Sequence, residues 1–382
     1  MKNLKYQKAS NIFGKIPAGV SGVGLGVAGL SNALNSQLNS SFIKTYFNVS
    51  KSICDDLSLA GFIIQSILIS ITIIAFILIL LKMITSFETI KKEMKDELVS
   101  SYLPTEAMCL ASIAYYIGIV STRNINNPDN LPIVNAGTII ATIMDVLAIA
   151  LHIFFMVAFL INVLFKHSIK KGYAYSSWLV PVCGIALSCS FEPKLGFLIP
   201  NEFYQITWYF ALAFFIILFP YILYKHLFFE RIDESKISSM AIFFAAPNLL
   251  LNGLINLFVE KDYYTDTFIS IFAIILMICS FIGSLFFYGS LFKCLKIKFN
   301  FSFAAFTFPS AVGALATIKM GDYVYENSLI DAKIPPIGNA LHILVTIFGI
   351  IFLIVSIIVV SYIFIKYVFG LIKLFKDNQN RN

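Results

Sequence analysis

The chain has 382 residues, of which 58% are hydrophobic and only 13% carry a charge, whereas globular domains carry about 25%. This composition excludes an ordinary soluble globular protein and indicates a membrane protein. The net charge of +7 does not indicate binding to nucleic acid, because the basic residues lie in short clusters between apolar runs.

The apolar runs predict an all-α membrane protein. Uncharged runs at 57–81, 267–292 and 335–365 each exceed the ~20 residues that a helix needs to cross the hydrocarbon layer. The runs and their breaks together predict ten spans within a single domain covering residues 1–382. The predicted spans are 15–36, 58–82, 104–122, 136–165, 177–192, 203–224, 237–258, 266–291, 300–319 and 336–366.

The basic residues predict the orientation of these spans. An even number of crossings puts both termini on one side of the membrane. The termini and the loops on that side hold 21 of the 28 Lys and Arg residues, and the loops on the other side hold 7. The positive-inside rule therefore predicts that both termini are cytoplasmic. One span more or fewer would destroy this asymmetry.

Two kinds of helix alternate along the chain. Each odd span contains or begins with a proline and is rich in small residues, whereas the even spans consist mainly of Ile, Leu and Phe. A proline-broken helix survives in a membrane only where protein or water satisfies the freed carbonyls. We therefore expect five antiparallel hairpins, with odd helices in an inner ring, buried in protein or lining a cavity, and even helices facing lipid. The expected kinks are Pro17, Pro104, Pro181, Pro247 and Pro309, and the small candidates for lining the pore are Gly22, Gly26, Gly184, Ser310 and Gly313. For each single proline the alternative is an ordinary membrane-helix proline, which has no special role.

The first span contains a glycine motif. Gly24, Gly26 and Gly29 have the G-x-G-x-x-G spacing of a dinucleotide-binding turn, but that motif requires a preceding strand and an acidic residue about 20 positions later. The run lies inside a predicted span instead. We interpret Gly22 and Gly26 as a small-xxx-small pair that allows close helix packing.

Three acidic or ionisable residues fall within the third and fourth spans. Glu106 follows Pro104 and is expected to cap the third helix, because a carboxylate is favourable at a helix N-terminus. Asp145 and His152 are seven residues apart on one face of the fourth helix. They are candidates for a proton relay, since ionisable groups at membrane depth are often functional. The alternative is a structural pair, with Asp145 bonded to a neighbouring helix and His152 packed as a neutral ring.

Further polar groups are candidates for contact with an anion. Asn248, Asn252 and Asn256 recur every four residues on the seventh span and form one polar stripe. Their amide groups could meet an anion, or they could form hydrogen bonds between helices. Arg123 and Lys319 lie at predicted extracellular ends, where we expect them to attract anions.

The sequence offers no pattern typical of a cofactor site or an enzyme. The six cysteines show no C-x-x-C spacing, and the histidines show no metal-ligand spacing. No nucleophile triad or pair of carboxylates is apparent in the sequence. We therefore expect no metal, no cofactor and no enzymatic activity.

The ninth span poses a question of its own. Residues 306–317 read FTFPSAVGALAT, so Pro309 interrupts an apolar run of small residues, and Phe308 stands directly before it. A proline in a helix interior removes a hydrogen bond and collides with the preceding turn. We expect Pro309 to bend an inner helix beside a cavity.

Four odd spans resemble a known family. AAFTFPSAVGALATIKMGDYV (304–324) resembles the ninth helix of the tellurite-resistance/dicarboxylate transporter family, which also contains the slow-type anion channels of plants and yeast malate and sulfite transporters. IPAGVSGVGLG (16–26), WLVPVCG (178–184) and FFAAPNLLLNG (243–253) are similar to its first, fifth and seventh helices. The resemblance covers most of the chain.

The resemblance implies a ten-helix protomer with a pore lined by the five odd helices, usually assembled as a trimer with one pore in each subunit. It also implies a phenylalanine gate on the ninth helix, which in this chain would be Phe308, with Phe306 as the fallback. The alternative is that Phe308 packs between helices, as most of the 38 phenylalanines must.

The resemblance further implies transport of small anions across a membrane, most simply the plasma membrane. One hypothesis is passive conduction of chloride, nitrate or organic dicarboxylates. The other is a proton-coupled transporter of C4-dicarboxylates such as malate, or of sulfite or tellurite, in which Asp145 or His152 would carry the proton. Both kinds occur in the family, so the resemblance does not choose between them. The expected partners are small anions, membrane lipid and two further copies of the chain.

Overall fold

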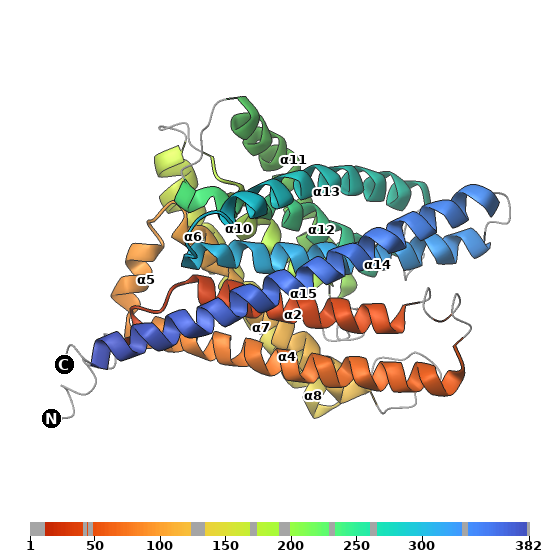
Figure 1. Ribbon diagram of the computed structural model, residues 1–382, viewed down its shortest axis with the longest axis horizontal. Coiled ribbons are helices and arrows are strands. Elements are labelled where there is room, and N and C mark those ends of the chain that lie inside the picture. Colours follow the sequence, from red (N-terminus) through yellow and green to blue (C-terminus); the bar gives the residue numbers. More distant parts are fainter. Residues whose placement is uncertain are drawn as a thin grey trace.

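The structure is a computed structural model that describes residues 12–40, 44, 49–123, 134–168, 174–190, 199–228, 234–259, 266–330 and 335–379. Within these ranges the chain is helical and contains no strand. In chain order the longer elements are α2 (Gly19–Asn39), α4 (Lys51–Thr85), α5 (Phe87–Glu93), α6 (Val99–Tyr102), α7 (Pro104–Thr122), α8 (Ala136–Phe159), α10 (Leu179–Cys183), α11 (Asn201–Phe228), α12 (Ile242–Leu254), α13 (Asp266–Cys294), α14 (Thr307–Ile330) and α15 (Pro335–Gln379). Figure 1 shows that α4, α14 and α15 run along the long axis of the molecule.

Shorter segments of 3-10 and π-helix join or extend these helices. The 3-10 segments are η2 (Ser176–Trp178), η3 (Gly184–Ser190), η5 (Glu234–Ala241) and η7 (Phe301–Phe306), and the π-helical ones are η1 (Leu160–Ser168) and η6 (Ile255–Val259). Three of the 3-10 segments directly precede α10, α12 and α14. The chain therefore enters three of its inner helices through a tighter helical turn.

Eight helices in the described part of the chain are long and apolar enough to cross a membrane. They correspond to eight of the ten predicted spans; Ala136–Phe165 has the predicted bounds, and the ends of the others differ from the predicted ones by up to several residues in either direction. The remaining two predictions, 15–36 and 177–192, fall on α2 and on a shorter apolar helical stretch, Ser176–Cys189. Both stretches are buried along most of their length.

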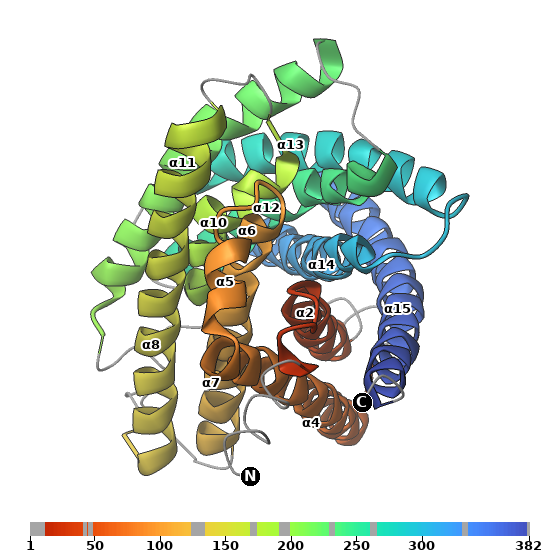
Figure 2. The same cartoon turned by 90° about the vertical axis from the view of Figure 1, so that its left-hand side faces the viewer.

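Burial divides the helices into two groups. We compared the most apolar 18-residue stretch of each long helix. This stretch is 94% buried in Lys236–Phe258 and 89% buried in Phe301–Tyr325. It is only 28% buried in Lys51–Thr85 and 33% buried in Phe268–Cys294. Figure 2 shows α2, α7, α10, α12 and α14 towards the middle of the molecule, and α4, α8, α11, α13 and α15 around them. Consecutive helices pack in pairs, namely α2 with α4, α7 with α8, α10 with α11, α12 with α13, and α14 with α15.

Small residues let α2 approach its neighbours closely. A Cβ on Gly24 would lie 2.6 Å from the Cβ of Ala75 on α4, and one on Gly26 would lie 2.8 Å from the carbonyl carbon of Thr307 on α14. Hydroxyl groups use this proximity, because Thr72 and Thr307 donate hydrogen bonds to the carbonyls of Gly24 and Gly22 at 2.8 and 2.9 Å. The glycine motif of the first span thus serves helix packing.

Most of the inner prolines mark the beginning of a helix and do not kink its interior, contrary to the prediction. Pro104 is the first residue of α7, while Pro181 and Pro309 are the third residues of α10 and α14. Pro17 precedes α2, and only Pro247 lies inside an inner helix. A proline is tolerated in the first turn because the N–H that it lacks has no intrahelical partner there. This explains why Pro309 can stand in an otherwise helix-forming run.

The C-terminal helix α15 is fastened to the start of η7. The Tyr367 hydroxyl donates a hydrogen bond to the carbonyl oxygen of Phe301, and the two rings pack with their centroids 5.1 Å apart. A Cβ on Gly370 would lie 3.0 Å from the Phe301 ring. The first residue of η7 is therefore held from the side by α15.

A buried ion pair connects α4 to α5 and to the turn before α2. The Lys82 side chain is 1% exposed, and its Nζ donates to Glu93 Oε1 at 2.5 Å and to the carbonyl oxygen of Ile16 at 2.6 Å. Burial raises the pKa of Glu93, and the hydrogen bond from Lys82 acts in the opposite direction. The pair thus holds three segments together, at the cost of removing two charges from water.

Candidate functional site

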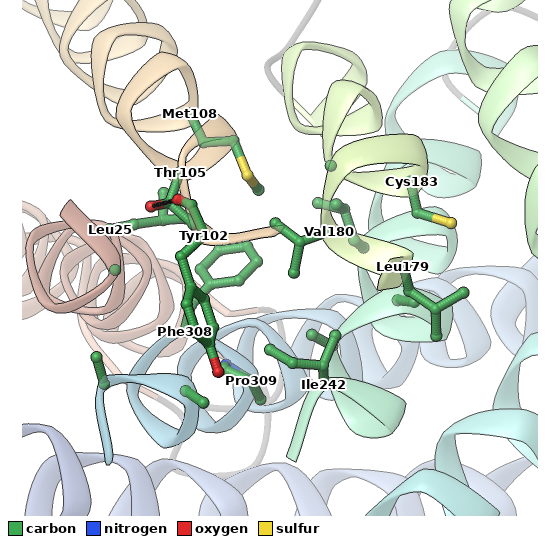
Figure 3. Close-up of a pocket in the computed structure, with 17 residues that line it drawn as sticks. Leu25, Tyr102, Thr105, Met108, Leu179, Val180, Cys183, Ile242, Phe308 and Pro309 are labelled. Carbon is green, nitrogen blue, oxygen red and sulfur yellow. Dashed lines mark hydrogen bonds between the residues drawn. The ribbon is translucent and has the colours of Figure 1, made fainter. Parts of the chain in front are cut away.

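A small cavity of about 40 Å³ lies among the inner helices. Its lining comes from α2, α6 with α7, α10, α12, and η7 with α14, so every odd predicted span contributes. Figure 3 shows the 17 lining residues, which are nearly all apolar or small. They are Gly22, Leu25, Tyr102, Thr105, Met108, Leu179, Val180, Cys183, Gly184, Ile242, Ala245, Ala246, Leu249, Ala304, Ala305, Phe308 and Pro309.

The two candidate phenylalanines of the ninth span point in different directions. Phe308 is half-buried and lines the cavity, as does Tyr102 (Figure 3). Phe306 is completely buried, and its ring packs edge-to-face on Phe287 of α13 with the centroids 5.6 Å apart. Phe308 is thus the phenylalanine of this pair that reaches the cavity.

The predicted small lining residues divide into two groups. Gly22 and Gly184 line the cavity, whereas Gly26, Ser310 and Gly313 are packing positions outside its lining. A Cβ on Gly313 would lie 2.1 Å from the ring of Phe244 on α12. The Ser310 hydroxyl donates to the carbonyl oxygen of Thr307 at 2.8 Å.

The asparagine stripe lies on a different face of α12 from the cavity. Ile242, Ala245, Ala246 and Leu249 are the α12 residues that line it. Asn248 instead accepts a hydrogen bond from Ser280 of α13 at 3.0 Å, which is the interhelical bond of the alternative interpretation. Asn252 is also buried and absent from the lining, and its Oδ1 has no hydrogen-bond partner.

Asp145 and His152 have separate partners. The carboxylate of Asp145 accepts hydrogen bonds from the Tyr204 hydroxyl at 2.8 Å and from the Ser188 hydroxyl at 3.0 Å. His152 Nε2 lies 2.9 Å from the carbonyl oxygen of Pro181. His152 and Ser188 also line a second cavity of about 10 Å³, close to the smallest space that holds one water molecule. These contacts bind α8 to η3, α10 and α11.

The two predicted mouth cations also have partners. The Arg123 guanidinium lies 3.8 Å from the ring centroid of Phe62 on α4. Its backbone N–H donates to the carbonyl oxygen of Ile119 at the end of α7. Lys319 Nζ donates a hydrogen bond to Asn256 Oδ1 at 2.7 Å, which joins α14 to η6. Lys319 is partly buried and Arg123 is exposed.

Glu106 differs from its prediction. It lies in the first turn of α7, but its side chain is 1% exposed and neither carboxylate oxygen has a hydrogen-bond partner. It therefore does not cap the helix. Its side chain is turned into the protein, because Pro104 places residue 106 on a part of α7 that is buried all round.

Tyr102 is a cavity residue that sequence reasoning missed. It ends α6, two residues before Pro104, and its ring lies in the cavity. A weak signal was available, since Phe308 also stands just before a proline that opens an inner helix. That pattern alone does not distinguish Tyr102 from the other 17 tyrosines of the chain.

The described residues contain no group of three His, Cys, Asp or Glu side chains placed to hold a metal ion. The cysteines are all free thiols. The side chains that line the cavity are apolar apart from the hydroxyls of Tyr102 and Thr105 and the sulfur atoms of Met108 and Cys183.

A bundle of apolar helices around a small central cavity is typical of membrane channels and transporters. Residues 15–368 match the SLAC1 family, described as voltage-dependent anion channel. The chain belongs to this family, whose members are anion channels and transporters. This finding confirms the resemblance seen in the sequence. A search of curated proteins found no match.

Proposed function

We propose that the protein is an anion channel of the plasma membrane that conducts small anions such as chloride, nitrate or organic dicarboxylates. The observation that carries the proposal is the apolar cavity lined by five inner segments. Walls without fixed charge bind an ion weakly, and conduction requires binding weak enough for the ion to leave. Family membership supplies the class of ion.

The proposal includes the architecture expected from the sequence. Ten membrane helices form five antiparallel hairpins in one domain, with odd helices around the pore and even helices facing lipid. Both termini are cytoplasmic, and three copies of the chain assemble with one pore each. The pairwise packing of consecutive helices and the contrast in their burial support this arrangement.

In this proposal Phe308 is the gate. A ring across a narrow apolar channel blocks it by excluding water as well as ions. The half-buried ring lies in the cavity and against α2, where a Cβ on Gly29 would lie 3.5 Å from it. Rotation of the ring would open the path, and no polar contact holds it in place. Arg123 and Lys319 would attract anions towards the mouth.

A second candidate function is a proton-coupled transporter of C4-dicarboxylates, sulfite or tellurite. The observation that favours it is the burial of two carboxyl groups, Asp145 and Glu106, within candidate spans. Ionisable groups at membrane depth are costly and are often functional.

Reversal potentials in reconstituted bilayers test the proposal and its alternative. We expect the potential to follow an imposed chloride gradient and to ignore a pH gradient. Coupled transport would shift it with pH by less than the about 59 mV per pH unit of a pure proton conductor. Absence of any anion current, in the wild type and in open-gate variants, would contradict the channel proposal.

We expect Asp145→Asn to leave anion current largely intact. The substitution keeps oxygen and nitrogen atoms in place to bond with Tyr204 and Ser188, and these contacts are structural in the channel proposal. Current per folded protein should change less than about twofold, which corresponds to under ~0.5 kcal/mol. Loss of transport in correctly folded protein would instead favour the proton relay.

A further inference from the structure

Only four of the residues that line the cavity carry oxygen or sulfur in their side chains, namely Tyr102, Thr105, Met108 and Cys183. The Thr105 hydroxyl is committed, because it bonds to the carbonyl oxygen of Tyr102 at 2.6 Å and to the Ser21 hydroxyl at 2.7 Å. The thiol of Cys183 points to the carbonyl oxygen of Ala211 at 3.8 Å. The Tyr102 hydroxyl is buried without any hydrogen-bond partner, and the residue as a whole is 9% exposed.

An unpartnered hydroxyl in a buried site calls for an explanation. Nearly all buried polar groups in proteins have a partner, and leaving one without costs the protein stability. A phenol carries its proton at neutral pH, so Tyr102 offers an O–H donor inside an apolar space. The group that matches such a donor best is an acceptor with negative charge, since hydrogen bonds to ions are shorter and stronger than neutral ones.

The position of Tyr102 relative to Phe308 places the Tyr102 hydroxyl on the proposed path of the anion. Tyr102 comes from α6, and Phe308 from the first turn of α14, yet both line the same cavity. Figure 3 shows the Tyr102 ring extending towards Phe308 and Pro309. Pro309 itself has no N–H to offer to an anion at this position.

We propose that the Tyr102 hydroxyl is the binding site for the permeating anion inside the cavity and sets selectivity among small anions. The ligand class is a halide or a small oxyanion such as nitrate that has shed part of its water. Thr105 holds the backbone of Tyr102 through its own hydrogen bond and so fixes the direction of the ring. This inference rests on the proposed channel function and adds the identity of its anion site.

Tyr102→Phe tests this inference, because it removes one oxygen and keeps the ring. In bilayers with the full-length protein, we expect the chloride concentration for half-maximal conductance to rise about tenfold, the effect expected when a hydrogen bond to an ion is lost. The nitrate-to-chloride permeability ratio should also shift. Tyr116→Phe is the matched control, since the Tyr116 hydroxyl bonds to Ser66 at 2.6 Å and Tyr116 lies on α7 outside the cavity. It should leave both quantities unchanged.

A binding measurement separates this inference from the channel proposal. Chloride or nitrate should raise the melting temperature of wild-type protein in detergent more than that of Tyr102→Phe, because a ligand stabilises the state that binds it. If the wild type conducts anions and Tyr102→Phe leaves half-saturation, permeability ratio and anion-dependent melting unchanged, the inference is overturned and the channel proposal stands. If no variant conducts but the melting difference appears, the channel proposal fails and the anion site stands. Misfolding of Tyr102→Phe would overturn the inference, because a hydroxyl without a partner can be removed without loss of stability.

Discussion

Phe308→Ala should produce a channel that is open at all times, with a conductance about tenfold or more above that of the wild type. A tenfold change corresponds to about 1.4 kcal/mol removed from a barrier, which is small for an aromatic ring that blocks an apolar path. The ring is half-buried and faces a cavity. Its loss should therefore cost less stability than the about 3–5 kcal/mol typical of a buried phenylalanine. Single-channel recording in planar bilayers measures the effect.

Phe306→Ala is the internal control for this experiment. Phe306 is fully buried against Phe287 and Phe303, so its truncation should lower stability and leave the path closed. The two residues are about 200° apart around a helix axis and cannot share a direction. If Phe306→Ala opens the channel while Phe308→Ala only unfolds it, the gate assignment is wrong.

Glu93→Gln should destabilise the protein by about 3–5 kcal/mol, which is the usual effect of breaking a buried ion pair. The substitution leaves the charge of the Lys82 ammonium buried without a counter-charge, and only neutral acceptors remain, namely the amide oxygen of the new Gln and the carbonyl oxygen of Ile16. The contact that joins the turn before α2, the end of α4 and α5 would then be weaker. Reversible unfolding in mixed micelles measures the free energy of unfolding.

The double variant Lys82→Met with Glu93→Leu should recover most of this loss, because apolar residues of similar volume often replace a buried pair at no net cost. Glu88→Gln on the same helix is the matched control. Its partner Lys91 lies 2.9 Å away, but both side chains are exposed, so the change should be too small to measure. An equal free energy of unfolding for Glu93→Gln and the wild type would show that the Lys82–Glu93 pair does not stabilise the protein.

The extent of the helices was predictable because length and hydropathy determine it. Apolar runs longer than about 20 residues have few alternatives to a membrane helix, and the described helices overlap all ten predicted spans. The contrast between inner and outer helices was also accessible, since prolines and small residues need protein around them. In both cases the information lies in one continuous segment of sequence.

The rotation of each inner helix about its own axis was not predictable in this way. Every residue of α12 is buried, so the helix has no polar face that would orient it. The spacing of the asparagine stripe left two interpretations open, and Asn248 makes the interhelical bond, to Ser280 of α13. For Phe308, the direction came from the family resemblance and not from the pattern of residues.

Contacts between separate helices could not be predicted from the sequence pattern either. The partners Lys82 and Glu93 are separated by a break between two helices, at Ser86, so helical spacing does not pair them. The 3-10 segments before α10, α12 and α14 have no sequence signature that would separate them from the α-helices that follow. As a result, all five prolines were expected to kink inner helices, whereas Pro104, Pro181 and Pro309 lie in the first turn of α7, α10 and α14.

The length of α15 has a mechanical consequence. Its 45 residues span about 68 Å at 1.5 Å per residue, more than twice the about 30 Å of hydrocarbon that a membrane offers. Tilting the helix does not fit its whole length into the membrane, so part of α15 must extend into water. The basic end with Lys373 and Lys376 is the part suited to water. Tyr367, which precedes this basic end, donates a hydrogen bond to the carbonyl oxygen of Phe301. The projecting end of α15 is therefore connected, through the contact of Tyr367 with Phe301, to the segment η7 that leads to Phe308.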